Sequence, residues 1–419
     1  MNSVFPNRFL KHLSLAAVAF IFLFHSLAMA QSRPQRPDDI PGNQKKNQRP
    51  TPKTEEELKK EEEQRKLDEM QRNAVVDDDV VKISTNLVNV DAVVYNKKTG
   101  QIITGLKKEN FGIFEDGVKQ DISNFATPEA PITVTLVMEY SKWSEIFGYD
   151  RGMGPNSGKL EVIRPIAYFL TRFIHPPDDY ASLIAFDIRP TPITDFTNDP
   201  NRIRQSIDLL LRNSPAFREN NLYDAIKFAL VGGKADSVVL ENSEERYSQY
   251  GGMVDVKAKR RAIILVASGI DTFSKINYGD ARKIIQESGI PIYIISTANL
   301  FFKKYEHRIP ATDSITGFPG RLTFLQAKNA MDTFARESGG VHYQMTFEGE
   351  LPDYLQSINA FLRNQYSLAY DAGEGHKPGK KYKLEVKVDV DGDGTYDDKN
   401  FVIQHRPFYV TPKEEKKEK

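Results

Sequence analysis

The hydrophobic pattern marks out a central region in which short apolar runs alternate with amphipathic stretches. Strands are expected at 132–138, 181–187, 261–267, 290–296 and 341–345, with 190–196 as a candidate hairpin partner of 181–187. Helices are expected at 159–174, 200–212, 222–230, 281–287, 323–338 and 350–363. Most of these strands are apolar almost throughout. The pattern therefore predicts a parallel sheet covered by helices on both faces, with ligands collecting at the carboxyl ends of the strands.

Strand texture also precedes and follows this region. The strands expected before it lie at 87–95, 101–104, 111–115 and 118–125, and those expected after it lie at 365–371, 380–390 and 400–410. Asp116-Gly117 is typical of a tight hairpin turn. Because neither set has enough strands to bury two faces alone, we predict one small β-sandwich built from 80–128 and 365–410, with an α/β domain at 129–364 between them.

The N-terminal 30 residues have the pattern of a secretory signal peptide. Arg8 and Lys11 give a basic start, residues 13–24 are almost wholly apolar, and Ala28-Met29-Ala30 supplies the small residues of a cleavage site. An uncleaved membrane anchor is the alternative, although the apolar run is shorter than the roughly 20 residues that span a bilayer. We expect an exported protein, periplasmic or secreted, with no transmembrane segment after cleavage.

Composition narrows the possible functions. Residues 31–79 form a proline-rich and then charge-dense stretch that reads as a disordered or charged linker, and 411–419 as a disordered tail. The 57 Lys and Arg residues balance 57 Asp and Glu residues, which gives no support to nucleic-acid binding through bulk positive charge. The absence of cysteine excludes disulfides, thiolate zinc sites and a cysteine nucleophile.

Several short motifs follow one another along the chain. They are Val88-Asn89-Val90, Thr104-Gly105-Leu106, Asn110-Phe111, Glu115-Asp116-Gly117 and Gln120, followed by Leu222-Tyr223-Asp224-Ala225-Ile226. In this order the chain resembles, over about residues 85–410, a family of exported bacterial proteins related to the von Willebrand factor type A domain, best known in acidobacteria. The resemblance implies a type A-like sheet with helices on both faces.

The resemblance also implies a metal-ion-dependent adhesion site at the carboxyl edge of the sheet, where type A domains hold Mg²⁺ through a D-x-S-x-S loop, a Thr and a further Asp. The corresponding positions here are Glu139, Ser141, Ser144, Asn220, Ser268 and Asp271. Glu139 replaces the first Asp, Trp143 stands at the second Ser position, and Ser268 replaces the last carboxylate. Hydroxyls and carboxylates hold Mg²⁺ octahedrally, so this poorer set predicts a degenerate site without tight Mg²⁺ binding.

The sequence gives little support to a zinc-hydrolase motif or a serine nucleophile motif. The histidines form no H-E-x-x-H spacing, and Ser268 lacks the glycine two residues earlier that a nucleophile elbow requires. We therefore expect a non-enzymatic protein that binds another protein or a surface polymer. The alternatives are an envelope hydrolase or other enzyme on the same scaffold, and a purely structural envelope component.

Two polar insertions, 232–258 and 300–321, have two possible interpretations. They are either mobile surface loops or contact surfaces. The second interpretation rests on their aromatic residues Tyr247, Tyr250, Phe301, Phe302, Tyr305 and Phe318.

Residues 389–398 resemble a calcium-binding loop. The candidate ligands are Asp389, Asp391, Asp393, Thr395 and Asp397. Gly394 stands at the sharp turn, but Asn400 replaces the bidentate Glu of an EF-hand, and strands rather than helices are expected on both sides. Five carboxylates in ten residues repel one another, which favours bound Ca²⁺. A plain Asp-Gly hairpin turn is the alternative.

Overall fold

The computed structural model describes residues 87–147, 157–213, 215–236, 247–373 and 376–411. The expected signal peptide, the linker at 31–79, the first residues of the N-terminal β unit and the tail from 412 lie outside the described residues. Among the helices described, none is both long and apolar enough to cross a membrane.

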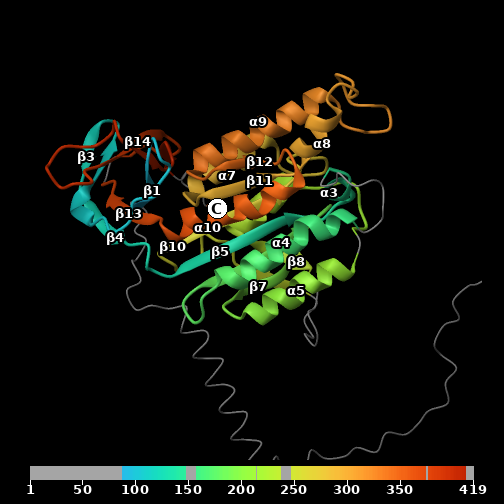
Figure 1. Cartoon of the computed structure of the whole chain (residues 1–419), viewed down its shortest axis with the longest axis horizontal. Helices are drawn as coiled ribbons and strands as arrows, with labels where there is room; N and C mark the ends of the chain where they lie inside the picture. The colour runs from blue at the N-terminus through green and yellow to red at the C-terminus, as the bar shows by residue number, and fades with distance from the viewer. Residues whose placement is uncertain (1–86, 148–156, 214, 237–246, 374–375, 412–419) are drawn as a thin grey trace, which may run out of the picture. The chain divides into compact units, whose positions relative to one another are not determined.

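A six-stranded sheet forms the centre of the α/β domain (Figure 1). Its strands are β5 (Ile132–Glu139), β6 (Tyr180–Phe186), β7 (Pro190–Thr197), β10 (Arg260–Ala267), β11 (Ile292–Ser296) and β12 (His342–Gln344). Their spatial order is β12-β11-β10-β5-β6-β7, in which the chain starts at the middle and winds outward in both directions. This order confirms the type A-like α/β fold class that the sequence predicts.

The sheet is mixed at one edge, because strand β7 runs antiparallel to β6. This pairing confirms the interpretation of 190–196 as a hairpin partner of 181–187. A connection of only three residues, 187–189, separates the two strands. So short a connection can form a hairpin but cannot cross over to a parallel neighbour.

Helices cover both faces of the sheet. The helices of one face are α4 (Ser157–Phe173), α5 (Pro200–Arg212) and α10 (Leu351–Arg363), and those of the other are α6 (Leu222–Val231), α7 (Tyr278–Ser288) and α9 (Arg321–Ser338). Their ends carry local signals: the Asp199 side chain caps α5 just before Pro200, and Asn277 and Asp280 form a capping box at the start of α7. Each face has its own apolar core.

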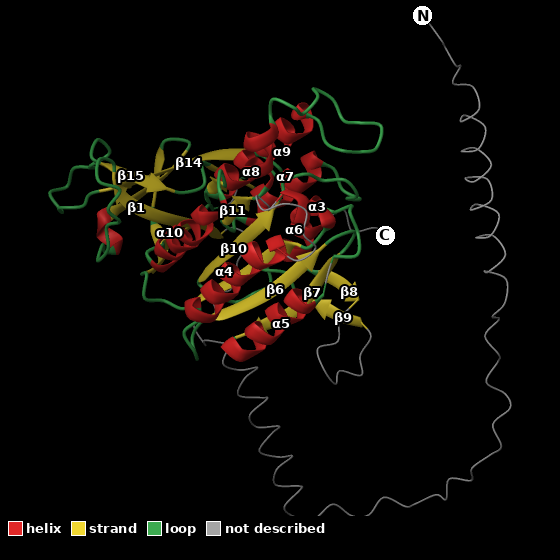
Figure 2. Cartoon of the chain, turned by 45° about the vertical axis from the view of Figure 1, so that its right-hand side comes forward, coloured by secondary structure: helices red, strands yellow, loops and turns green. Residues whose placement is uncertain are grey.

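The two polar insertions contain elements that the pattern did not predict. They are α8 (Ala298–Tyr305) and a hairpin of β8 (Gly233–Asp236) with β9 (Tyr247–Tyr250), which lies beside β7 (Figure 2). Tyr250 is buried against Phe228 and Phe196, with ring centroids 5.0 and 5.6 Å away. Its hydroxyl bonds Ser182 at 2.8 Å.

The aromatic residues of the second insertion are also internal. Phe302 is buried, and Phe301, Tyr305 and Phe318 pack against the same small core, to which Trp143 of the unpredicted helix α3 (Lys142–Phe147) belongs. Phe302 and Tyr250 are therefore core residues, while Phe301, Tyr305 and Phe318 are partly buried. The interpretations of the two insertions as mobile loops or contact surfaces stay predictions.

The strands before and after the α/β domain pair with one another. One sheet has the order β15-β1-β13-β4 and the other the order β16-β14-β2-β3. Their bounds are β1 (Leu87–Asn96), β2 (Phe111–Glu115), β3 (Val118–Gln120), β4 (Ile122–Ala126), β13 (Tyr366–Asp371), β14 (Lys381–Val388), β15 (Phe401–Gln404) and β16 (Phe408–Val410). Inward-facing side chains of both sheets share one core. The sandwich is thus built from N- and C-terminal strands. The strand expected at 101–104 is only an isolated bridge at Ile102.

Arg260 forms hydrogen bonds with both segments that connect the sandwich to the α/β domain. Its side chain is fully buried. Its guanidinium donates to the carbonyls of Pro128 and Ala130, on the segment that leads into β5, at 2.6 and 2.5 Å. It also donates to the carbonyl of Leu362, in the last turn of α10, which has no partner further along the helix. One side chain therefore fixes both places where the chain passes from one part to the other.

Candidate functional site: a closed sheet edge and an acidic loop

Glu139 is the centre of the candidate adhesion site. It ends β5, the middle strand of the sheet, and is only 4% exposed. Its Oε1 accepts hydrogen bonds from the Ser141 hydroxyl at 2.6 Å and from Nδ2 of Asn220 at 2.9 Å. Its Oε2 accepts from the backbone N–H of Ser268 at 2.6 Å. The carboxylate thereby ties together three loops at the carboxyl edge.

The loop after β5 is closed on itself. The Ser141 Oγ accepts from the backbone N–H groups of Trp143 and Ser144 at 3.1 and 3.3 Å. The Ser144 hydroxyl donates to the carbonyl of Ser141 at 2.6 Å. Trp143 is buried, and the guanidinium of Arg218 lies 4.4 Å from its ring centroid. An indole and a cation therefore stand where a type A site needs a hydroxyl ligand.

This donor set does not fit Mg²⁺. The ion needs about six oxygen ligands in octahedral geometry, whereas this edge offers the single carboxylate of Glu139, since Trp143 and Ser268 stand where type A domains have a hydroxyl and a carboxylate. The Ser141 hydroxyl directs its hydrogen at Glu139. Among the described residues of this site, Asn220 Oδ1 is a buried oxygen without a hydrogen-bond partner, and one such oxygen is too few for the ion. The site residues support the expectation of a metal-free edge.

Asp271 lies apart from the Glu139 cluster. Gly269, with φ of +87°, adopts a left-handed conformation that turns the chain after β10. The Asp271 Oδ1 accepts from the backbone N–H of Tyr223 at 3.3 Å and from the Ser274 hydroxyl at 2.5 Å. Burial raises the pKa of Asp271, and the nearby charge of Asp224 adds to this. Of the six predicted positions, Glu139, Ser141, Asn220 and Ser268 meet, Ser144 flanks them, and Asp271 faces α6.

The Ser268 hydroxyl has no catalytic partner among the described residues. It accepts a hydrogen bond from the backbone N–H of Ile270 at 3.3 Å. The histidines with described partners lie elsewhere: His175 and His342 meet Asp179 and Asp332 at 3.5 and 2.6 Å, His376 meets Glu115 at 2.5 Å, and His405 meets the carbonyl of Arg406 at 2.7 Å. None of these four histidines is therefore placed to activate Ser268.

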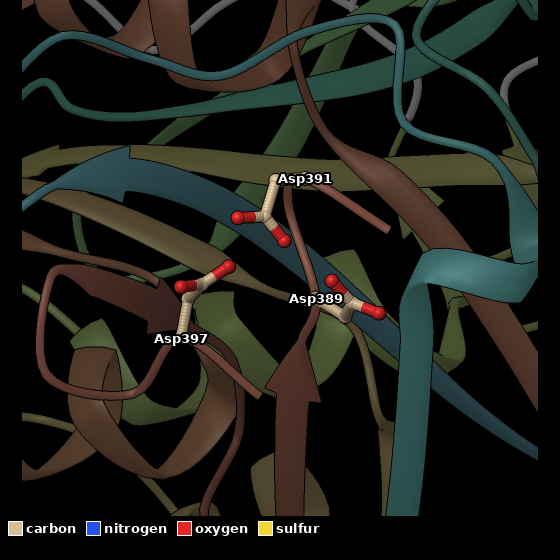
Figure 3. A group of neighbouring side chains, drawn as sticks. All are labelled: Asp389, Asp391 and Asp397. Carbon is tan, nitrogen blue, oxygen red and sulfur yellow. The ribbon is translucent and has the colours of Figure 1, made fainter. Parts of the chain in front are cut away.

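Three carboxylates of the acidic loop come together. Asp389, Asp391 and Asp397 offer oxygens that lie within 4.8 Å of one another, and Figure 3 shows their side chains around a common space. Asp389 Oδ1 and Oδ2 accept from the backbone N–H groups of Gly392 and Gly394, each at 2.8 Å. Burial opposes the charge of Asp389, but these N–H groups outweigh it and lower its pKa.

Asp393 and Thr395, the other two predicted ligands of the loop, are not among these three carboxylates. Asp393 accepts from the backbone N–H of Thr395 at 2.7 Å and is not one of the three clustered carboxylates. Asp397 Oδ2 accepts from the N–H of Val390 at 2.9 Å, which closes the loop between the two ends. The loop therefore presents a group of three carboxylates suited to a hard cation, between β14 and β15.

A pocket beside the closed edge was missed by the sequence analysis. It has a volume of about 450 Å³ and lies between α6, α7, α9 and the loop after β10. Tyr223, Tyr278 and Asp271 are among the residues that line it. Tyr223 belongs to the motif at 222–226, and Asp271 is one of the six predicted adhesion-site positions. Only the fold shows that they share a cavity.

Comparisons with family models and with curated proteins found no match. Solved structures similar to this chain include that of proximal thread matrix protein 1 from the mussel byssus, at 10% identity and a TM-score of 0.37, covering 59% of this chain and 50% of that one. This chain thus spans about half the length of the mussel protein.

Two bacterial structures are also similar. The conserved hypothetical protein BatB from Bacteroides thetaiotaomicron is 13% identical with a TM-score of 0.34, covering 56% of this chain and 100% of that one. The von Willebrand factor domain of the type V pili tip protein Mfa5 from Porphyromonas gingivalis is 13% identical with a TM-score of 0.36, covering 56% and 95%. The fold assignment rests on the strand order and connectivity described above.

Proposed function

We propose that this chain is an exported, non-enzymatic binding protein, periplasmic or secreted, whose carboxyl-edge loops bind a protein partner without a bridging metal ion. The observation that carries the proposal is the closed Glu139 cluster, in which the protein's own donors take the place of metal and ligand. An edge closed in this way leaves its outer loops as the contact surface.

Those loops and the first turns of α9 expose large apolar side chains. The exposed residues are Phe217, Phe273, Ile315, Leu322 and Leu325. We call them the edge residues. Large exposed apolar side chains are typical of protein-binding surfaces, in which aromatic residues are enriched. This favours a protein partner over a polar surface polymer.

Hydrogen bonds hold the loops that carry the edge residues next to one another. The N–H of Lys142 donates to the carbonyl of Phe217 at 2.8 Å, and the N–H of Phe273 donates to the carbonyl of Asn220 at 2.8 Å. Arg218 reaches the carbonyl of Thr316 at 3.4 Å. The edge residues therefore stand on a preorganised frame, which lowers the entropic cost of binding.

The partner can be sought by capture from an envelope extract with the purified protein. We expect a captured protein that remains bound in EDTA and is no longer captured by the Phe273→Ser variant. The Phe273 side chain is 58% exposed in the wild type. The matched control is Val118→Ser, which removes an exposed apolar side chain from the sandwich and leaves capture unchanged. Capture that EDTA abolishes, or that Phe273→Ser and Val118→Ser leave equally intact, contradicts the proposal.

We further propose that the acidic loop binds Ca²⁺, with Asp389, Asp391 and Asp397 as central ligands and Asp393 and the Thr395 carbonyl as the ligands that the sequence motif adds. Without the bidentate Glu, we expect weak affinity, about 10⁻⁴–10⁻³ M as in extracellular modules. At 10 mM Ca²⁺ this corresponds to about 1–3 kcal/mol of stabilisation by mass action.

Thermal unfolding with and without Ca²⁺ tests this site. Ca²⁺ should raise the melting temperature of the wild type by a few degrees, and Asp391→Asn should abolish the increase. Asp398→Asn is the control, because it removes the same charge from the same loop but lies outside the three-carboxylate group. If 10 mM Ca²⁺ leaves the wild-type melting curve in place, the loop is only a turn.

A further inference from the structure

The pocket beside the closed edge combines aromatic, apolar and acidic surfaces. The rings of Tyr223 and Tyr278 meet edge to face, with centroids 6.3 Å apart. Ile270, Ala327 and Ala330 supply an apolar lining, and all three are buried. At about 450 Å³ the pocket has the size of an ordinary ligand site and holds a long side chain with room for part of its backbone.

Its electrostatics favour a cation. Asp271 lines the pocket and forms no ion pair among the described residues, and its hydrogen-bond partners Tyr223 and Ser274 are neutral donors. Burial, and to a smaller extent the charge of Asp224, raise the pKa of Asp271, and a cation bound beside it would favour the ionised form and so offset both effects. Burial likewise raises the pKa of Tyr223 to about 12, so its ring stays neutral. The faces of neutral tyrosine rings attract cations.

We propose that this pocket takes the basic side chain, arginine or lysine, of a protein partner, with its charged head at Asp271 and its methylene stem along Ala327 and Ala330. The proposal rests on the proposed function, because the pocket adjoins the edge residues: Phe273 follows Asp271 by two positions, and Leu322 adjoins Thr323 of the lining. A basic anchor there sets the register in which the apolar edge residues meet the partner.

The pocket can be tested without knowing the partner. N-acetyl-arginine amide is titrated into the purified protein, and binding is followed by two-dimensional NMR. The neutral N-acetyl-norleucine amide serves as the control ligand. We expect saturable shifts for pocket residues with the arginine amide and at least tenfold weaker binding of the norleucine amide.

Two variants locate the interaction. Asp271→Asn keeps an oxygen for Tyr223 and Ser274 but loses the charge, and should weaken arginine-amide binding at least tenfold. Asn329→Lys places a cation at the pocket from an exposed position of α9, and should weaken it similarly even if Asp271→Asn proves unstable. Asp208→Asn, an exposed position on α5 on the other face of the sheet, should leave binding unchanged.

The outcomes separate this inference from the proposed function. Equal binding of the two amides, or full affinity in both Asp271→Asn and Asn329→Lys, overturns the basic-anchor proposal. Partner capture that is lost with Phe273→Ser but unaffected by Asp271→Asn also overturns it, while the edge surface stands. Loss of capture in both variants, together with weakened arginine-amide binding in Asp271→Asn, supports it.

Discussion

Replacing Glu139 with alanine should destabilise the protein strongly, because this carboxylate is the common acceptor of three loops. The change removes the acceptor of the Ser141 hydroxyl, the Asn220 amide and the Ser268 N–H. All of these donors belong to buried residues, so water does not replace the lost acceptor. Each unsatisfied buried group costs about 1–3 kcal/mol, which gives about 3–9 kcal/mol for the set.

Glu139→Gln should be milder and serves as the matched variant. A glutamine oxygen at the place of Oε1 retains the bonds from Ser141 and Asn220, while its NH₂ group faces the N–H of Ser268. One donor loses its acceptor, which costs about 1–3 kcal/mol. The order of stability should therefore be wild type, then Gln, then Ala.

Urea and thermal unfolding, followed by circular dichroism, measure these differences. For a protein of this size 1 kcal/mol shifts the melting temperature by about 2 °C, so Glu139→Ala should melt about 6–18 °C lower. Glu219→Ala, at an exposed carboxylate of a nearby loop, should stay within about 0.5 kcal/mol of wild type. A Glu139→Ala protein as stable as wild type would refute the closed-edge description, because its donors would then have other acceptors.

Two further predictions concern the rest of the fold. Arg260→Met should cost at least about 3 kcal/mol, because three carbonyls lose their donor, whereas exposed Arg202→Met should cost almost nothing; urea unfolding checks both, and equal stabilities would contradict the role of Arg260. Deleting residues 365–410 removes β13 and β15, the partners of β1 on both sides, and β14, the partner of β2, so residues 87–126 should become sensitive to limited proteolysis. If 87–126 stays resistant without those strands, it is an independent unit.

The central sheet was predictable because its strands are buried on both faces. Strand β5 is buried at every position, and its apolar run from Ile132 to Met138 is visible in the sequence. The short helix α3 could not be found in this way, since its six residues KWSEIF are too few to show a helical period. Its position depends on Trp143 packing against Phe318, a contact 175 positions away in the chain that no local pattern records.

Some misplaced boundaries did have a local signal. The single strand expected at 400–410 is two strands, β15 and β16, which belong to different sheets. Pro407 lies between them, and a proline cannot donate to a strand ladder. The strand expected at 118–125 is likewise divided at Asp121 between the two sheets. In both cases polar residues, 119–121 and 404–406, mark the point at which the chain changes sheets.

The candidate site depended on information of different kinds. Glu139, Ser141, Asn220 and Ser268 were named because the resemblance to type A domains implies metal-ligand positions there. That Glu139 reaches both Ser141 and Ser268 depends on the length of its side chain in the folded edge. The position of Asp271 follows from the left-handed turn at Gly269, and the pocket that it lines requires α9 in place.

Calorimetric titration of the purified protein with Mg²⁺ tests the metal-free edge most directly. The titration uses the Asp391→Asn variant, so that the acidic loop does not contribute. The closed Glu139 cluster predicts no binding heat in the micromolar range and no change on Ser141→Ala. A micromolar isotherm that Ser141→Ala abolishes would show that the edge opens to hold a metal ion, and would contradict the account.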